Sequence, residues 1–374
     1  MSNDKASGNQ VLVLDDVGLP LSTEVRSIPQ AGYGSAVIRI LAASIRPNSP
    51  HVYEDPGSGH PLPVPFVPGF AAIGRFHQAG PDATNLKRGR LVFFDNYIRG
   101  RDNNDAVYIS GLMEGFNEES GRLAKEIWRD STYAQYARVP LENCHAIDER
   151  LLTSSDSGGL GYTIDDLTHL FNMTIPFGGL SDIDVQSGET VIVAPATGRY
   201  GSAAVHLALA MGAKVIAVGR NGNVLSDISS VSSRVQTVQL SSDVEKDTRA
   251  IVAAAQGSIE AFFDMSPAAA SESSHFQSCL RALSKGARVS LMGSVSDVKF
   301  GYMDIMVKGL TIKGTWMCKT EQTKRLIKMV ETGVLPLGDR AKMGPVKTFK
   351  LSQWEEAFKY VKDHKEPGEI VFTP

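Results

Sequence analysis

Between Val191 and Asn221 the chain reads VIVAPATGRYGSAAVHLALAMGAKVIAVGRN. The β-branched residues at its start predict a buried strand, the apolar spacing up to Gly212 predicts a helix that ends at this glycine, and KVIAV predicts a second strand. A helix that follows a tight turn directs its free N–H groups and the positive end of its dipole at whatever lies over the turn. We therefore expect a pyrophosphate, and hence a dinucleotide, to bind at this bend.

The turn supplies candidate cofactor-binding residues. Gly198 permits close approach of the backbone to the ligand, and Gly201 lets the helix pack closely on the strand. The peptide groups of Thr197, Arg199 and Tyr200 are expected to contact the diphosphate. A single glycine spacing is a weak signal, because any tight turn favours glycine, but here the strand, turn, helix and second strand follow in frame.

The end of the second strand bears on the choice between NAD and NADP. A site that prefers NAD carries an acidic residue here to bind the ribose hydroxyls, whereas this chain has Gly219, Arg220 and Asn221. An arginine can pair with the 2′-phosphate of NADP or stack on adenine. The sequence thus predicts NADP as the cofactor, and a solvated loop position is the alternative for Arg220.

Strand and helix patterns continue to alternate as far as Trp316. After KVIAV come VQTVQL, a helix over 244–255, IEAFFD, a helix over 270–283, ARVSLMG and LTIKGTW. This alternation predicts an α/β fold with a doubly wound parallel sheet. Three residues that follow strands of this sheet are expected to contact the cofactor, with ordinary strand-end turns as the alternative. They are Ser266, Gly293 and Ser294.

The first part of the chain has a different pattern. Short apolar runs between Val11 and Val139, such as SAVIRILAAS and RLVFF, are separated by Gly, Pro and Asn and predict an antiparallel, barrel-like β domain. Residues 99–128 carry no clear pattern. A helix over 320–331 and the strand and helix patterns after it are expected to return to this domain. The predicted domains are 1–172 completed by 319–374, and 173–318.

The composition is that of an ordinary folded protein. Its 374 residues suffice for about two domains of roughly 150 residues. The 38 Lys and Arg against 41 Asp and Glu give a net charge of −3, which argues against nucleic acid and membranes as partners. Cys144, Cys279 and Cys318 lack metal-ligand spacing, and residues 1–10 lack the apolar run of a signal peptide. The predicted location is cytoplasmic.

Several motifs together resemble the medium-chain dehydrogenase/reductase superfamily. LPVPFVPGFAAIGRFHQAGPDATNLKRGRLVF is similar to the family's PxVPGxExxGxVxxVGxxVxxxKxGDxV, and TYAQYARVP, TIPFGGL, PATGRYG and LSKGARVSLMG resemble further pieces. The resemblance extends over nearly the whole chain and points to the zinc-lacking branch around quinone oxidoreductases and enoyl reductases. It implies a GroES-like domain, a Rossmann domain, a nicotinamide cofactor, a small-molecule substrate bound in the cleft between the domains, and a homodimer.

The departures from this family concern the metal and the turn. The zinc members carry a catalytic Cys and a His where this chain has Arg46 and Phe70, and residues 95–112 contain none of the cysteines of the family's structural zinc lobe. Neither Arg nor Phe can ligate zinc, so we expect no metal. Pro195 replaces the first glycine of the family's turn and removes one N–H donor to phosphate.

Without a metal, a substrate carbonyl must be polarised by hydrogen-bond donors. By the resemblance, Asn48 and His51 stand where the zinc alcohol dehydrogenases carry a proton-relaying hydroxyl and histidine. Tyr53 is a second candidate acid, and Tyr97 is the preferred donor in the segment that lines the family's pocket. The alternatives are that Asn48 caps a turn, that His51 is solvent-exposed, and that the tyrosines pack in loops. Thr174 resembles the threonine beside the nicotinamide in the family.

The leading hypothesis is a zinc-independent, NADPH-dependent oxidoreductase that transfers hydride to an activated C=C bond of an enone or enoyl substrate. Simple alcohol oxidation is hard without zinc, because nothing lowers the pKa of the alcohol. The alternatives are a zinc-less carbonyl reductase or alcohol dehydrogenase, and a non-catalytic NADPH-binding sensor or structural protein. The sequence lacks the Tyr-x-x-x-Lys of short-chain dehydrogenases and the G-x-S-x-G turn of serine hydrolases.

Overall fold

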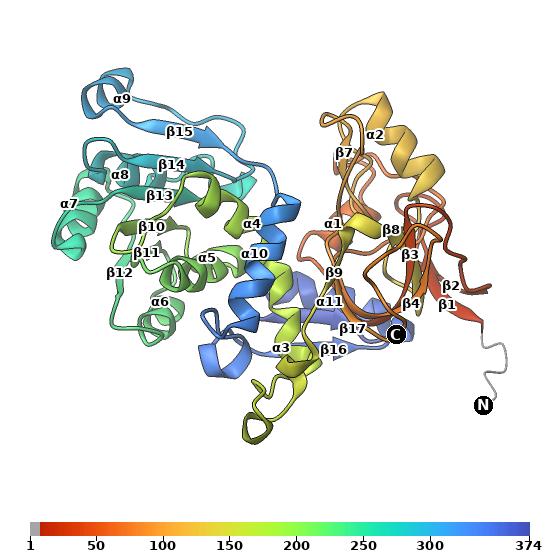
Figure 1. Cartoon of the computed structure of the whole chain (residues 1–374). Coiled ribbons are helices and arrows are strands. Elements are labelled where there is room, and N and C mark those ends of the chain that lie inside the picture. Colours follow the sequence, from red (N-terminus) through yellow and green to blue (C-terminus); the bar gives the residue numbers. More distant parts are fainter. Residues whose placement is uncertain (1–7) are drawn as a thin grey trace. The chain divides into compact units, whose positions relative to one another are not determined.

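The computed structural model describes residues 8–374, which form two compact units. The first unit runs up to Phe171 and also contains Pro345–Lys365 and Glu369–Pro374. The second contains Asn172–Gly344 and Glu366–Gly368. Figure 1 shows that each unit has a sheet of its own.

The second unit is built on a parallel sheet with the strand order β12-β11-β10-β13-β14-β15 (Figure 1). The chain builds outward from β10 through β11 to β12, and then returns to β13 on the other side of β10. This is a doubly wound topology, so the predicted α/β fold is confirmed. The strands are β10 Thr190–Ala194, β11 Lys214–Gly219, β12 Val235–Gln239, β13 Ala261–Asp264, β14 Arg288–Leu291 and β15 Thr311–Gly314.

Helices cover both faces of this sheet. Right-handed crossovers place α5 and α6 on one face and α7 and α8 on the other. On the second face, Ile192 and Val218 of the strands share one apolar core with Ile251 of α7 and Phe276 of α8. The helices are α4 Leu170–Asp182, α5 Arg199–Ala210, α6 Gly222–Ser229, α7 Val244–Ala255, α8 His275–Ala282, α9 Tyr302–Lys308 and α10 Thr320–Glu331, with short turns η5 Ala268–Ala270 and η6 Gly338–Ala341.

Residues 319–344 lie in the second unit, whereas the sequence interpretation returned them to the first. Helix α10 is held there by α4. Lys319 Nζ lies 2.9 Å from Asp182 Oδ1, and the Arg325 guanidinium lies 5.9 Å from the ring centroid of Phe177. The part of the tail that rejoins the first unit therefore begins at Pro345.

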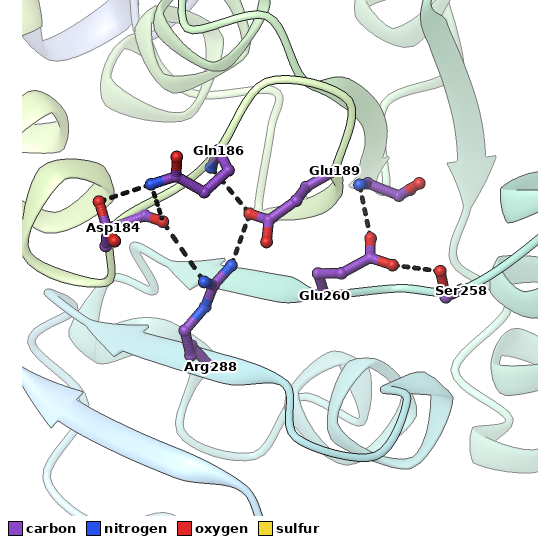
Figure 2. Close-up of polar contacts among 7 residues, drawn as sticks. Asp184, Gln186, Glu189, Ser258, Glu260 and Arg288 are labelled. Atoms are coloured by element: carbon purple, nitrogen blue, oxygen red, sulfur yellow. Dashed lines mark hydrogen bonds and ion pairs between the residues drawn. The ribbon is translucent and has the colours of Figure 1, made fainter.

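Polar side chains tie the amino ends of the central strands to the loop before β10 (Figure 2). At the start of β14, the Arg288 guanidinium donates to Asp184 O at 3.3 Å and to Glu189 Oε2 at 2.5 Å. Glu260, just before β13, accepts from Thr190 N at 2.7 Å. These bonds hold β10, β13 and β14 in register, and the register decides where the same strands end at the opposite edge.

The first unit consists mainly of β-structure, as the sequence predicts. Its main sheet has the order β16-β17-β3-β4-β5-β9, with β8 also paired to β3, while β1-β2 and β6-β7 form antiparallel ribbons. β17 pairs with β3 at Val371 and Ser44, so the end of the chain completes this sheet. The strands are β1 Asn9–Val13, β2 Ser22–Arg26, β3 Ser35–Ser44, β4 Ala72–Ala79, β5 Leu91–Phe94, β6 Tyr97–Arg99, β7 Val107–Ile109, β8 Tyr136–Pro140, β9 Cys144–Ala146, β16 Val346–Phe349 and β17 Glu369–Phe372.

Short helices connect the strands of the first unit. Residues 99–128, which carry no sequence pattern, hold β7, helix α2 and a π-helical turn η1, where Tyr108 and Ala124 pack with Trp128 in a small core. Within residues 8–374 no helix is long and apolar enough to cross a membrane. The helices are α1 Ser49–Glu54, α2 Glu118–Arg122, α3 Ile164–Thr168 and α11 Trp354–Asp363, with short turns η1 Leu123–Ile127, η2 Leu141–Asn143, η3 Glu149–Leu152, η4 Ser155–Ser157 and η7 Leu351–Gln353.

Candidate functional site

The candidate cofactor site lies at the carboxyl edge of the parallel sheet, between β10 and β13. These neighbours are the strands from which the chain leaves in opposite directions, and ligands of doubly wound proteins bind at such a switch point. The backbone joins them beyond the strands, where Met265 N donates to Ala194 O at 3.1 Å. The predicted phosphate turn and the predicted contact residue Ser266 therefore follow neighbouring strands at the same edge of the sheet.

The turn after β10 leads directly into α5. Ala196 N donates to Val218 O at 2.8 Å, so this peptide group still belongs to the sheet. Gly198 is the N-cap of α5, with extended backbone (φ −92°, ψ 171°), and as a glycine it has no side chain that could cap the helix. The peptide groups of Thr197, Arg199 and Tyr200 thus lie at the N-terminus of this helix, which favours an anion.

Two glycines of this region have no room for a side chain. A Cβ on Gly201 would lie 2.0 Å from Pro195 O, so the helix touches the turn at this point. A Cβ on Gly219 would lie 2.6 Å from Thr197 Cγ2, so the end of β11 also packs against the turn. Gly198, by contrast, faces open space. These contacts fit a backbone that approaches a diphosphate closely. Pro195, which replaces the family's first glycine, leaves the space beside Gly198 open.

The residues on which the NADP prediction rests follow β11 directly. The Arg220 side chain is exposed, and its carbonyl accepts from Gln239 Nε2 at 3.0 Å. Asn221 caps α6, because its Oδ1 accepts from Asn223 N at 3.1 Å and from Val224 N at 3.3 Å. The backbone around Arg220 is therefore fixed on both sides, while its guanidinium is free to reach a ligand phosphate.

A buried chain of hydrogen bonds, missed by the sequence reasoning, follows β13. Ser266 Oγ donates to Asp264 Oδ1 at 2.5 Å and lies 2.6 Å from His275 Nε2, and His275 Nδ1 lies 2.7 Å from Ser273 Oγ. Because the Ser266 proton goes to the carboxylate, His275 Nε2 is the donor to Ser266. The only sequence signal for this chain is the Asp-x-Ser spacing directly after the apolar strand.

This chain changes the role expected for Ser266. Its hydroxyl is engaged by Asp264 and His275, so the side chain serves to position the backbone and not to bind the cofactor directly. Ser266 O accepts from Ser294 N at 2.8 Å, and a Cβ on Gly293 would lie 2.8 Å from Asp264 Oδ2. The segments after β13 and β14 are thereby locked together. The serine lies between the acid and the histidine, which is not the order of a hydrolase triad.

Thr174 lies buried in α4. This helix packs closely on the end of the sheet, since a Cβ on Gly178 would lie 2.3 Å from Met317 O and one on Gly179 would lie 2.6 Å from Ser290 Oγ. Met317 itself has a left-handed backbone (φ 65°), which a non-glycine residue adopts rarely. The structure therefore places Thr174 on the helix that packs against the segment after β15.

In the first unit, Asn48 is the N-cap of the short helix α1, and His51 is the third residue of this helix. Asn48 is exposed at its N-cap, where its carbonyl accepts from Val52 N at 2.9 Å but its side chain makes no capping bond. His51 Nδ1 lies 3.3 Å from Asp55 Oδ2, and the His51 side chain is 56% exposed. Both side chains are exposed, so a ligand can reach them. Their roles as proton donors stay predictions.

The two candidate tyrosines differ. The Tyr53 hydroxyl donates to Gly111 O at 2.7 Å, its ring packs with Phe66 and Phe358, and burial raises its pKa well above the ordinary value. Tyr53 is therefore a core residue, which corrects its expected role as proton donor.

The pKa of Tyr97 is also raised, by burial, although Arg99, whose Cζ lies 4.2 Å from the ring centroid, opposes the shift. Its hydroxyl stays protonated at neutral pH, as a proton donor must. Tyr97 is thus the remaining tyrosine candidate.

The residues at the expected zinc positions do not fit a zinc ion. Arg46 is buried, its Nη1 donates to Ser44 Oγ at 3.3 Å, and its Cζ lies 5.2 Å from the ring centroid of Phe70. Across residues 8–374, no three His, Cys, Asp or Glu side chains gather to hold a metal. Cys144 and Cys279 are buried thiols, and burial raises the pKa of each. Thiolate ligation of a metal is therefore disfavoured here.

Comparisons with known proteins agree with this architecture. A model of the alcohol dehydrogenase GroES-like domain matches residues 32–149, and a model of zinc-binding dehydrogenases matches residues 201–332. The fold and the site together define an oxidoreductase with a dinucleotide-binding unit. The chain belongs to the medium-chain dehydrogenase/reductase superfamily, whose members are expected to bind a nicotinamide dinucleotide.

Individual relatives are distant. The L-threonine 3-dehydrogenase of Paraburkholderia phytofirmans is 22% identical over 354 residues, or 91% of this chain and 92% of that enzyme. The crystal structure of AibC matches with a TM-score of 0.79 at 18% identity over 100% of this chain and 98% of that one. An E. coli CFT073 alcohol dehydrogenase complexed with NADH matches with a TM-score of 0.73 at 17% identity over 98% and 100% of the two chains. These likenesses show the fold, and the zinc-lacking branch stays a prediction.

The glycines of the turn offer a matched test. Gly201→Ala should lower the free energy of unfolding by about 1–3 kcal/mol, because the new methyl group would collide with Pro195 O. Gly198→Ala adds the same methyl group in open space and should change stability by less than about 0.5 kcal/mol. Chemical denaturation of the two variants measures both values. Equal stability of the two variants would contradict the packing described for Gly201.

Proposed function

We propose that this chain is a zinc-independent, NADPH-dependent reductase of activated C=C bonds in small enone or enoyl substrates. The observation that carries the proposal is the Arg46 and Phe70 pair, which fills the zinc-ligand positions with a buried cation and an aromatic ring. Without a Lewis acid an isolated alcohol or carbonyl is a poor reactant, whereas a conjugated C=C bond is already polarised. The reaction class, the use of NADPH, the independence of zinc and a location in the cytoplasm are all proposed here in addition to the family assignment.

The side chains of this protein would bind and orient the reactants. When bound, NADPH supplies the hydride, which adds to the β-carbon of the substrate, and a proton must reach the α-carbon. The N-terminal end of α5 and the exposed Arg220 fit the phosphates of NADPH. We assign Tyr97, kept protonated by burial, as the proton donor to the α-carbon, and the exposed Asn48 amide as a hydrogen-bond donor to the developing oxyanion.

The reaction class is tested with matched substrates. The protein should oxidise NADPH with an α,β-unsaturated ketone at least tenfold faster than with the corresponding saturated ketone, and a chelator should not change either rate. Loss of NADPH absorbance measures the rates, and product analysis shows whether the C=C or the C=O bond was reduced. An allylic alcohol product would favour the carbonyl reductase alternative, and NADPH binding without turnover of any substrate would favour the sensor.

Cofactor choice is tested at Arg220. Arg220→Asp should weaken NADPH binding about 10- to 100-fold and change NADH binding by less than threefold, because a charge-assisted pair with the 2′-phosphate contributes about 1.5–3 kcal/mol. Lys285→Asp is the control, since it makes the same charge change at an exposed position before β14, at the opposite edge of the sheet. Fluorescence titration gives the dissociation constants. An unchanged preference in Arg220→Asp would refute the assignment.

We also propose that the chain pairs with a second copy through the open end of the parallel sheet. β15 is the edge strand, and α9 beside it carries several exposed apolar side chains. An unpaired strand edge next to such a surface favours association. The exposed apolar residues are Tyr302, Met303, Met306 and Val307.

The dimer is tested by its mass in solution. Met303→Arg combined with Val307→Arg should convert the dimer to a monomer, because two buried charges would oppose association. Val252→Arg, at an exposed apolar position on α7, should leave the mass unchanged. Sedimentation equilibrium distinguishes the two states. A monomeric wild-type chain, or a dimer that survives the double substitution, would contradict this interface.

A further inference from the structure

A cavity of about 250 Å³ opens in the second unit, away from the candidate cofactor site. Its walls come from the C-terminal half of α5, the connection between α6 and β12, the segment after α10, and η6. It lies at the amino end of β12, whereas the dinucleotide turn lies at the carboxyl edge of the same sheet. Along α5, Arg199 at the turn and His206, the first residue of this helix that lines the cavity, are separated by about 10 Å of helix.

The charged side chains that line this cavity are all basic. Arg234, Arg340 and Lys342 line it together with His206, and none of its described lining residues is Asp or Glu. The chain as a whole has a net charge of −3, so the excess of basic side chains around this cavity does not follow from the overall composition. A concave site with one sign of charge concentrates counter-ions of the opposite sign.

Two of these cations are held by neutral partners. The Arg234 guanidinium donates from Nη1 to Ala213 O at 2.9 Å and from Nη2 to Leu209 O at 2.9 Å. Lys342 Nζ donates to Ser230 O at 3.1 Å and to Ser230 Oγ at 3.2 Å. Carbonyl and hydroxyl oxygens orient these groups but leave their charge intact. A cation that is fixed in place and not neutralised is suited to bind an anion.

The backbone at Lys342 and the buried side chain of His206 also limit how the groups at this site can move. Lys342 has a left-handed backbone (φ 55°), which is uncommon for a non-glycine residue and costs free energy unless the surroundings hold it. His206 is 7% exposed, so its imidazole forms part of the wall and not of the surface. The cavity therefore combines a fixed arginine, a fixed lysine and a buried imidazole.

We propose that this cavity binds a phosphate dianion, either free or as the phosphate group of a small ester, independently of the dinucleotide. Arg234, Arg340 and Lys342 place three positive charges around the cavity, which favours an anion of more than one negative charge. The site requires no turnover and does not depend on the proposed reaction. Arg234 also stabilises the end of α5 by binding Leu209 O and the start of β11 by binding Ala213 O, so Arg340 and Lys342 are the better positions for a test.

The test is a titration of the full chain with inorganic phosphate at constant ionic strength, with chloride as the reference anion. Phosphate should bind saturably and raise the melting temperature, as a ligand of the folded state does. Arg340→Gln combined with Lys342→Gln should weaken this binding at least tenfold. Lys324→Gln combined with Lys328→Gln removes the same charge from exposed positions on α10 and should not change it.

Two further arms distinguish the alternatives. Arg220→Asp should leave the phosphate titration unchanged, and loss of the signal in that variant would show that phosphate binds at the dinucleotide turn and would overturn the proposal. Equal phosphate binding by the Arg340→Gln, Lys342→Gln variant and the wild type would also overturn it. Phenyl phosphate identifies the source of the anion. Tighter binding than inorganic phosphate indicates an ester ligand, weaker binding indicates free phosphate, and both support the site.

Discussion

The candidate cofactor site depends on the contact between α5 and the turn that follows β10. Gly201 lies against Pro195 O with no space for a Cβ, so the first turn of the helix touches the end of the strand. Any side chain at residue 201 would push the helix away and move its N-terminal peptide groups out of line with the sheet. The anion-binding property of the helix end is therefore a consequence of packing and not of any single charged residue.

The buried chain of Asp264, Ser266 and His275 extends this rigidity to the neighbouring strands. A buried carboxylate is costly unless it is hydrogen-bonded, and Ser266 Oγ satisfies one of its oxygens. The same serine holds His275, and the Ser266 carbonyl holds Ser294 N. The loops after β13 and β14 thus form one unit, which means that a ligand in this crevice meets a preorganised backbone.

The sequence predicts the regular elements well where periodicity decides them. The helices expected over 244–255 and 320–331 match α7 and α10, because apolar spacing and caps mark both ends. Side-chain partners are harder, since they depend on residues far apart in the chain. Tyr53 is a core residue because of Gly111, 58 positions away, and no local pattern encodes that pairing. The fold of residues 99–128 depends on a small core that is equally invisible in the sequence.

By the family resemblance, Arg46 and Phe70 stand where the zinc members of the superfamily carry metal ligands. Arg46 follows two residues after Ser44, which pairs with Val371 of β17, and the Arg46 side chain is buried. Arg46 is therefore built into the core of its unit together with the last strand of the chain. Such a cation contributes a fixed field but offers no exchangeable position for a substrate oxygen. A metal ligand at position 46 would have to replace a side chain that forms part of this core.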